Sequence, residues 1–404
     1  MIARHMKCKQ STKLVGRGMN MKGVIRDMIE GLWPNDIFRG PFGLELLADI
    51  CGVPSVSGAQ LGMQHFLRTT LAGLVTEFGK HQGNLFAIRR GATDRGCVLF
   101  IVHIDRVGFL VSRIDKETGA LRVRAMGGID PAAVLTNYVE IHTKLGPVPG
   151  VIGCTPVHFQ KGADEKKPLK PEDLFVIPQG AFEENASIRV GDPISIFSPL
   201  DTHSPVCLRS LALDDGLGVW QGCNILRIAE ELYPKLNGEQ HPTIIVCFTT
   251  EEETGARGAE RAVHHLIQRY SPDLAIVVDT TASTAIPGVS KDVAGDIGLD
   301  GPVITFADGG MVYTRPLVED VIDVASELAI VHYIRATPFG GTDGSKVAIT
   351  GGGVATVSVS TPSLNIHTAS MSIKKAAARR TLLLLSTLLL DPDTSSHLIK
   401  VARG

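Results

Sequence analysis

The stretch TIIVCFTTEEETGARGA, from Thr243 to Ala259, decides the fold of this chain. Its apolar, β-branched first half is typical of a buried strand, and Gly255 and Gly258 suit the turn into a following helix. Three adjacent glutamates, residues 251–253, stand where that strand ends, the position at which open α/β sheets place their chemistry. Because these carboxylates repel one another, we expect a divalent cation among them; an exposed acidic turn at a helix N-terminus is the alternative.

The bulk composition indicates a globular protein. Of the 404 residues, 44% are hydrophobic and 20% charged, so we expect a large core and more than one domain. A net charge of -2, no basic stripe and only 5% aromatic residues argue against nucleic-acid binding. No window reaches the ~18 apolar residues of a membrane helix. The seven cysteines include no CxxC pair, which predicts reduced thiols in a cytoplasmic protein.

The chain contains two kinds of secondary-structure pattern. Residues 41–109 and 201–404 combine apolar strands with amphipathic helices, whereas residues 110–200 contain short strands, Gly and Pro. We therefore predict an α/β catalytic domain built from the first two segments, with a small β domain inserted between them. Residues 1–40 form an N-terminal extension without the apolar core of a secretory signal, and its later methionines favour a ragged tail or a later start codon over a transit peptide.

Potential metal ligands recur at the ends of these elements. Four positions follow apolar strands and one opens a helix: His103, Glu252 or Glu253, Asp279, His367 and Asp214. Two imidazoles with three or four carboxylates suit paired zinc, cobalt or manganese and do not suit a lone calcium ion. Each residue alone has a simpler explanation, since an HxD pair is commonly a surface salt bridge and an acid at a helix start is commonly a cap.

Three further acids, Asp105, Asp215 and Asp343, have either a structural or a functional interpretation. Asp105, two residues after His103, suits a carboxylate that orients a metal-bound imidazole. At least one of Asp214 and Asp215 is expected to cap its helix. Asp343, in the glycine-rich GGTD, is interpreted as a turn or cap in preference to a group that shapes a site.

The order His, Asp, Glu-Glu, Asp, His is that of the co-catalytic dizinc exopeptidases. Within that clan the sequence resembles the glutamyl-aminopeptidase family, which includes the tetrahedral aminopeptidases. The resemblance extends from about Gly43 to Leu390. Its motifs are VSG (56–58), GN (83–84), HIDRVGFLV (from 103), GGID, GVIG and VGD (ending at 130, 153 and 192), ALDD (ending at 215), EETGARGA (from 252), VDTT (278–281), GGTD (ending at 343) and IHT (366–368).

The resemblance implies a mixed sheet flanked by helices, with an inserted dimerisation-type β domain. It also implies a metal-dependent aminopeptidase that removes N-terminal residues from peptides through a water activated by two divalent ions. Zinc is the expected metal, with cobalt or manganese as alternatives. A homo-oligomer is expected, built from dimers that can assemble into a tetrahedral dodecamer.

The resemblance also implies a role for each matching residue. One metal would be held by His103 and Asp279, the other by Glu253 and His367, and Asp214 would bridge both. In addition, Glu252 would be the general base and Asp105 the partner of His103, whereas Glu251 would lie outside the metal ligands.

Departures from the family pattern leave alternatives open. Arg106 stands where the family usually has Glu, Gly216 where it has Arg, and residues 363–365 where it has an aromatic, Arg-bearing segment. None is a proposed ligand, so these departures bear on substrate preference and assembly. The alternatives are another dimetal amide hydrolase, such as a carboxypeptidase or deacylase, or an inactive metal-binding homologue. A glycosidase is disfavoured, because adjacent glutamates cannot readily face each other across a sugar at ~5–9.5 Å.

Overall fold

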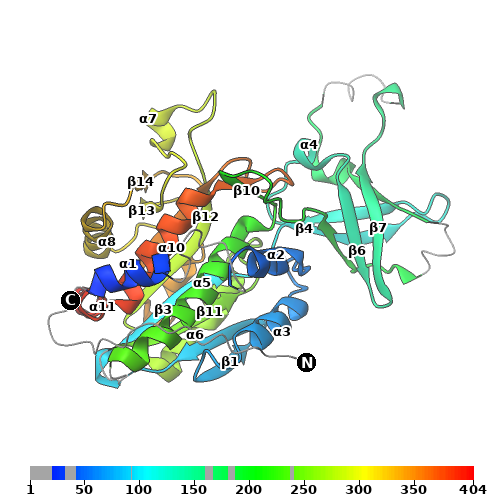
Figure 1. Ribbon diagram of the computed structural model, residues 1–404. Helices are drawn as coiled ribbons and strands as arrows, with labels where there is room; N and C mark the ends of the chain where they lie inside the picture. Colours follow the sequence, from blue (N-terminus) through cyan, green and yellow to red (C-terminus); the bar gives the residue numbers. More distant parts are fainter. Residues whose placement is uncertain (1–20, 32–41, 92, 160–166, 181–186, 237–240) are drawn as a thin grey trace.

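A computed structural model describes residues 21–31, 42–91, 93–159, 167–180, 187–236 and 241–404 (Figure 1). Eight strands form one sheet in the order β1-β2-β11-β3-β12-β15-β13-β14. Their bounds are β1 Glu77–His81, β2 Asn84–Arg89, β3 Cys97–His103, β11 Thr243–Thr249, β12 Leu274–Ala282, β13 Val303–Ala307, β14 Tyr333–Ala336 and β15 Ala355–Ser363. Strands β11, β3, β12 and β15 run parallel, while β1, β2 and the β13–β15 pair are antiparallel, so the predicted mixed sheet is confirmed.

Helices cover both faces of the sheet. The long ones are α1 Met21–Gly31, α2 Leu44–Gly52, α3 Leu61–Thr70, α5 Leu213–Leu232, α6 Arg257–Tyr270, α8 Arg315–Glu327, α10 Lys375–Leu390 and α11 Pro392–Arg403. Three short ones lie in connections: α4 Pro131–Val134, α7 Lys291–Ala294 and α9 Gly344–Val347. Strands β10 Cys207–Arg209 and β16 Ser372–Lys374 form a separate pair.

Both faces of the central strands are buried, which explains their unbroken apolar runs. In β3, Val98 and Phe100 pack into the core that contains Trp220 of α5, whereas Leu99 and Ile101 pack into the core beneath α6. This alternation follows from the two-residue period of a strand. The sheet is therefore a fixed platform from whose carboxyl edge side chains can project.

The inserted segment closes into a six-stranded barrel in the order β4-β5-β8-β7-β6-β9. The bounds are β4 Gly108–Ile114, β5 Leu121–Met126, β6 Tyr138–Thr143, β7 Gly146–Gly153, β8 Phe175–Pro178 and β9 Pro193–Ile196. The barrel has its own core and projects to one side of the α/β domain (Figure 1). The predicted small β insert is confirmed, and its closure into a barrel is a feature that the sequence interpretation did not include.

Most of the predicted N-terminal extension, residues 1–40, lies outside the described residues; of it, α1 packs against α10. The exact domain limits remain a prediction. Within the described part of the chain, no helix combines the length and apolar character needed to cross a lipid bilayer.

Candidate metal centre

Residues in or directly after five elements, four strands and one helix, converge at the carboxyl edge of the sheet. His103 ends β3 and Asp279 lies near the end of β12, the strands that run parallel to each other. Glu253 follows β11, His367 follows β15, and Asp214 lies at the start of α5. Because parallel strands end at the same edge, residues far apart in the sequence meet there. The peptide bond between Asp214 and Asp215 is cis.

Asp214 lies between the two imidazoles. Its Oδ1 is 3.5 Å from His103 Nε2, and its Oδ2 is 3.2 Å from His367 Nε2. Beyond them, His103 Nε2 is 3.6 Å from Asp279 Oδ1, and His367 Nε2 is 3.6 Å from Glu253 Oε2. One carboxylate thus faces two separate His–acid pairs, an arrangement that suits a bridge between two cations.

These separations fit divalent-metal ligation. Two ligand atoms each about 2.1 Å from one zinc ion at a tetrahedral angle lie about 3.4 Å apart. The buried Oε1 of Glu253 and Oδ2 of Asp215 have no hydrogen-bond partner within the described structure, so both offer free lone pairs. A nitrogen and carboxylate donor set with orphaned buried oxygens fits zinc, cobalt or manganese alike.

Asp215 was not among the site residues predicted from sequence. A ring nitrogen of His103 and one carboxylate oxygen each of Asp215 and Asp279 lie close enough to reach a common ion, and Asp214, Glu253 and His367 form a second such group. The other carboxylate oxygen of Asp215 accepts a hydrogen bond from the Gly218 amide at 3.0 Å, which is the helix-cap role predicted for one of the two aspartates. The signal available in the sequence was the Asp-Asp pair itself.

The three glutamates after β11 occupy distinct environments. The carboxylate of Glu251 pairs with Arg261 at 2.6 Å, away from the metal ligands. Glu253 faces His367, as described above. Glu252 lines the open cleft but forms no ion pair with a described histidine, lysine or arginine. This side chain is therefore free to meet a substrate.

Asp105 contacts the site in a way that differs in detail from the expectation. The imidazole of His103 donates from Nδ1 to the backbone oxygen of Asp105 at 3.0 Å, whereas the Asp105 carboxylate is 3.7 Å away. That carboxylate accepts hydrogen bonds from the amides of Glu252 (3.0 Å) and Glu253 (3.3 Å) and from the hydroxyl of Ser57 (2.5 Å). Asp105 thus fixes the backbone that carries Glu252 and Glu253.

The second imidazole is oriented by the inserted barrel. His367 Nδ1 donates to the carbonyl oxygen of Gly128 at 2.7 Å. Since a carbonyl can only accept, this bond places the proton on Nδ1 and leaves Nε2 as a lone-pair donor when the ring is neutral. Gly128 lies in the GGID motif, and the sequence interpretation did not place it in the site.

The electrostatics of the cluster require positive charge. Burial raises the pKa of Glu252 well above its ordinary value, with the charges of Asp279 and Asp343 adding to it and His103 opposing it. Burial and the charge of Asp214 raise the pKa of Glu253 to about 8. Although its own burial opposes the change, hydrogen bonding to Asp214 raises the pKa of His367 to about 9. Divalent cations would reverse these shifts by compensating the carboxylates.

Asp343 is more than the turn or cap predicted for it. The residue lies directly before α9, but its side chain makes no capping bond to that helix. Instead its buried carboxylate accepts from the hydroxyl of Thr249, the last residue of β11, at 2.5 Å. Burial raises its pKa to about 7. Asp343 therefore supports the strand end that carries the glutamates.

A cleft of about 430 Å³ opens beside the centre. Asp214, Glu252, Glu253, Asp279 and His367 line one end of it. Its remaining walls come mainly from the last residues of β12, the segment that follows β12, and the segment that begins in β14. The centre is thus accessible to a molecule of the size of an amino-acid residue.

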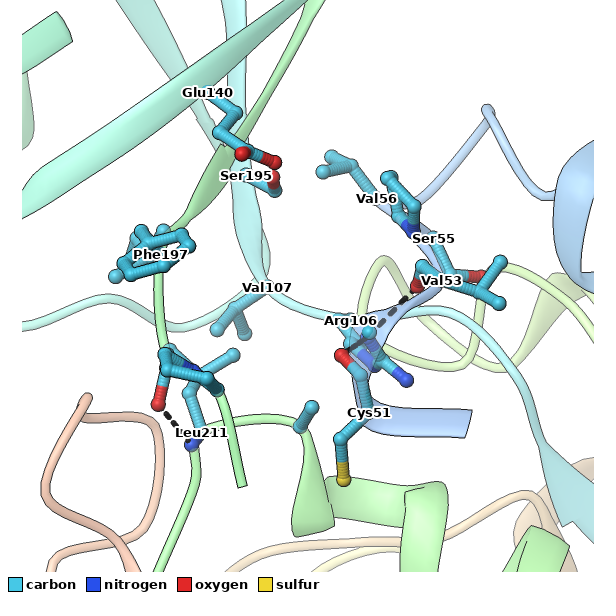
Figure 2. Close-up of a pocket in the computed structure, with 16 residues that line it drawn as sticks. Cys51, Val53, Ser55, Val56, Arg106, Val107, Glu140, Ser195, Phe197 and Leu211 are labelled. Carbon is cyan, nitrogen blue, oxygen red and sulfur yellow. Dashed lines mark hydrogen bonds between the residues drawn. The ribbon is translucent and has the colours of Figure 1, made fainter. Parts of the chain in front are cut away.

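A second cavity, of about 150 Å³, lies where α2 meets the barrel, and none of the proposed ligands lines it. Figure 2 shows Arg106 on one side of this cavity and Glu140 and Ser195 of the barrel on the other. The buried guanidinium of Arg106 donates to the backbone carbonyls of Ile50 (2.6 Å), Cys51 (3.1 Å) and Val53 (2.9 Å). This departure from the family pattern therefore has a structural role at the end of α2.

The fold and this acid–imidazole cluster define a metal-dependent hydrolase whose candidate metal ligands lie at the carboxyl edge of a mixed sheet. The chain belongs to the M42 glutamyl aminopeptidase family, whose sequence profile matches residues 83–383. It is accordingly an enzyme of the metallo-aminopeptidase class.

Known aminopeptidases align with this chain over most of their length. The chain is 28% identical to the lysyl aminopeptidase of Pyrococcus furiosus, covering 80% of this chain and 90% of that protein. It is 27% identical to the glutamyl aminopeptidase of Lactococcus lactis subsp. cremoris, covering 78% and 86%. Among solved structures, the TET aminopeptidase from the marine sediment archaeon Thaumarchaeota archaeon SCGC AB-539-E09 is similar with a TM-score of 0.80 at 25% identity, covering 87% of this chain and 98% of that one.

Proposed function

We propose that this enzyme removes N-terminal residues from peptides with two divalent ions per chain. The observation that carries the proposal is the position of Asp214, with one carboxylate oxygen facing each of two imidazoles. His103 and Asp279 would hold one ion, and Glu253 and His367 the other. Asp215 lies close enough to join the first group.

Bound at these positions, the two ions would supply Lewis-acid activation of water and of the scissile carbonyl. The chain's own residues supply the rest. Glu252, which lines the cleft, takes the proton of the attacking water on its carboxylate and transfers it to the nitrogen of the leaving amine. Asp105 holds the amides of Glu252 and Glu253, so base and ligand keep a fixed separation.

The test combines metal content with activity. We expect about two metal ions per chain by elemental analysis and metal-dependent hydrolysis of leucyl- and alanyl-p-nitroanilide. Glu252→Gln should retain metal and lower kcat by about 10²–10⁴-fold. Glu251→Gln is the matched control, since its carboxylate pairs with Arg261 outside the centre, and it should keep kcat within about twofold of the wild-type value.

Three other results would argue against an aminopeptidase. Hydrolysis of N-acetylated substrates in place of free-amine ones would indicate a deacylase. Metal binding without any hydrolysis would indicate an inactive homologue. A protein that binds no divalent metal would contradict the proposed centre itself.

The proposal also includes self-association of the chain and its location in the cell. Several large apolar side chains of the barrel are exposed, among them Tyr138 (62%), Leu145 (88%) and Phe159 (75%), and they provide surface for self-association. We propose a homo-oligomer built from dimers that can assemble into a tetrahedral dodecamer. Light scattering that shows a monomer would contradict it. The cysteines that the structure describes are free thiols, which supports a cytoplasmic location.

A further inference from the structure

The small cavity between α2 and the inserted barrel has opposite charges on its two sides. Arg106 lies on one side, and Glu140 and Ser195 of the barrel lie on the other (Figure 2). Within the part of the chain that the structure describes, neither Arg106 nor Glu140 forms an ion pair. A cation and an anion therefore face a common space without contacting each other.

The guanidinium of Arg106 retains hydrogen-bonding capacity. It is 8% exposed, and three backbone carbonyls at the end of α2 accept from its Nη1 and Nη2 atoms. A guanidinium has donors on all three nitrogens, so the Nε hydrogen and one Nη2 hydrogen have no partner among the described residues. The carbonyl dipoles compensate the buried charge only in part. This side of the cavity consequently favours a carboxylate.

The barrel side of the cavity provides acceptors. Glu140 of β6 and Ser195 of β9 are directly paired across the two strands, and both line the cavity. The hydroxyl oxygen of Ser195 lies 2.7 Å from His142 Nε2. Burial lowers the pKa of His142, although the charge of Glu140 opposes the shift, so this imidazole is neutral at pH 7 and does not compensate Glu140. This side therefore favours an ammonium group.

The volume of the cavity limits the size of a ligand. A cavity of about 150 Å³ is comparable to one that holds benzene, a molecule of about six non-hydrogen atoms. Apolar side chains form much of the wall between the two charged sides: Val53, Val56, Val107, Ile196 and Leu211. A well-matched ligand is thus small, partly apolar, and carries one negative and one positive group.

We propose that this cavity binds a small free amino acid, with its α-carboxylate at Arg106 and its α-ammonium group at Glu140 and Ser195. The cavity shares no lining residue with the cleft beside the metal centre. Binding there requires neither metal nor hydrolysis, so the site goes beyond the proposed function. An aminopeptidase would nevertheless release such a ligand as its product.

The proposed site lies beside backbone that supports the metal centre. The amide of Arg106 donates to the carbonyl of Ser55 at 2.9 Å, and the carbonyl of Arg106 accepts from the amide of Ser57 at 3.2 Å. The Ser57 hydroxyl in turn donates to Asp105. Because Arg106 belongs to the α/β domain and Glu140 to the barrel, a bound amino acid would hold the two domains together at this point.

Calorimetry on the zinc-loaded enzyme tests the site with three probes. L-Alanine has both charged groups, propionate lacks the ammonium group, and ethylamine lacks the carboxylate. We expect L-alanine to bind at least about tenfold more tightly than either of the others, because each of them loses the charge-assisted hydrogen bonds on one side of the cavity. Propionate binding as tightly as L-alanine would indicate a site for simple carboxylates and would overturn the proposal.

Variants of the barrel locate the binding. Glu140→Gln should weaken L-alanine binding at least about tenfold and remove its advantage over propionate. Ser195→Ala should give a smaller loss in the same direction, and it serves as the test if Glu140→Gln does not fold. Glu117→Gln is the matched control, because Glu117 lies in an exposed turn of the same barrel outside the cavity. Its affinity for L-alanine should stay within about twofold of the wild-type value.

Two outcomes separate this site from the metal centre. L-Alanine binding that is equal in the wild type and in both barrel variants occurs elsewhere, such as at the metal centre, and overturns the proposal even if aminoacyl anilides are cleaved. If no aminoacyl anilide is cleaved but L-alanine still binds and its binding depends on Glu140, the aminopeptidase function fails while the amino-acid site stands.

Discussion

The Nδ1 atom of His367 lies 2.7 Å from the carbonyl oxygen of Gly128, so the inserted barrel orients an imidazole of the α/β domain. The preceding residue, Gly127, has φ +90°, and a Cβ there would lie 2.7 Å from Val107 and 3.2 Å from Glu253. The GGID motif thus brings backbone against two proposed ligands of one metal, at a distance that only glycine permits.

Gly127→Ala should therefore lower metal occupancy. The new methyl group would displace Glu253 and, through the shifted backbone, His367, so we expect a drop from about two toward one ion per chain. Gly191→Ala is the matched control, because Gly191 has φ +93° but open space around its Cβ position. Elemental analysis of both variants checks this. Equal metal content in the two would show that the close approach is unimportant.

Asp105→Asn should reduce activity by about 10–100-fold while the protein remains folded. The amide retains the size of the carboxylate but binds the Glu252 and Glu253 amides less strongly, so base and ligand lose their fixed positions. Ser57→Ala, which removes one hydroxyl bond to Asp105, should have a smaller effect in the same direction. Steady-state kinetics with a neutral substrate measures both, and a larger loss in Ser57→Ala would argue against this order.

Metal removal should make stability depend on pH. In the metal-free protein the pKa of Glu253 is raised to about 8, that of Asp343 to about 7 and that of His367 to about 9. The folded state then holds protons that the unfolded chain releases, so this stabilisation is fully present below the unfolded pKa values and is lost progressively until pH reaches about 7 to 9. Asp214, whose pKa is lowered by its histidine partners despite burial, titrates below this window.

Calorimetric unfolding between pH 6 and 9 checks the sign, with chelator and with added zinc. We expect Tm of the chelated protein to fall by at least about 2 °C across the window, and that of the zinc-loaded protein to change less because metal displaces these protons. A chelated protein whose Tm rises over the same range would contradict the proton uptake.

Arg106 and Gly216 should show energetic coupling. A Cβ at Gly216 would lie 3.3 Å from Ile50 and 3.8 Å from Arg106 Nη2, so Gly216→Arg would bring two guanidinium groups together. Arg106→Glu alone would leave the carbonyls at the end of α2 without donors. We expect each single variant to lose about 2 kcal/mol or more in free energy of unfolding, and the double variant to recover about 1–3 kcal/mol of the sum.

Urea unfolding of the four proteins in this cycle gives the coupling energy directly. The double variant restores the Glu and Arg that the family pattern usually has at these positions. Strictly additive losses would mean that the two departures arose independently.

Local patterns predicted much of this protein from sequence. The unbroken apolar runs of β3 and β11 reflect burial on both faces. Because parallel strands end at one edge, residues at strand ends were expected to meet, and the structure brings together His103, Asp214, Glu253, Asp279 and His367. Asp215, near the start of α5, likewise accepts a hydrogen bond from the Gly218 amide, the cap role predicted for one of the two aspartates.

Only the tertiary structure decided the remaining features. Closure of the barrel depends on pairing between β4 and β9, strands about 80 residues apart, which no local periodicity encodes. The contact of Gly128 with His367 and the position of Arg106 across a cavity from Glu140 depend on how separate elements pack. Sequence periodicity indicates how each segment is buried. The distances between segments are set by packing of the whole chain. These distances fix the orientation of the proposed metal ligands and the charge that a substrate meets.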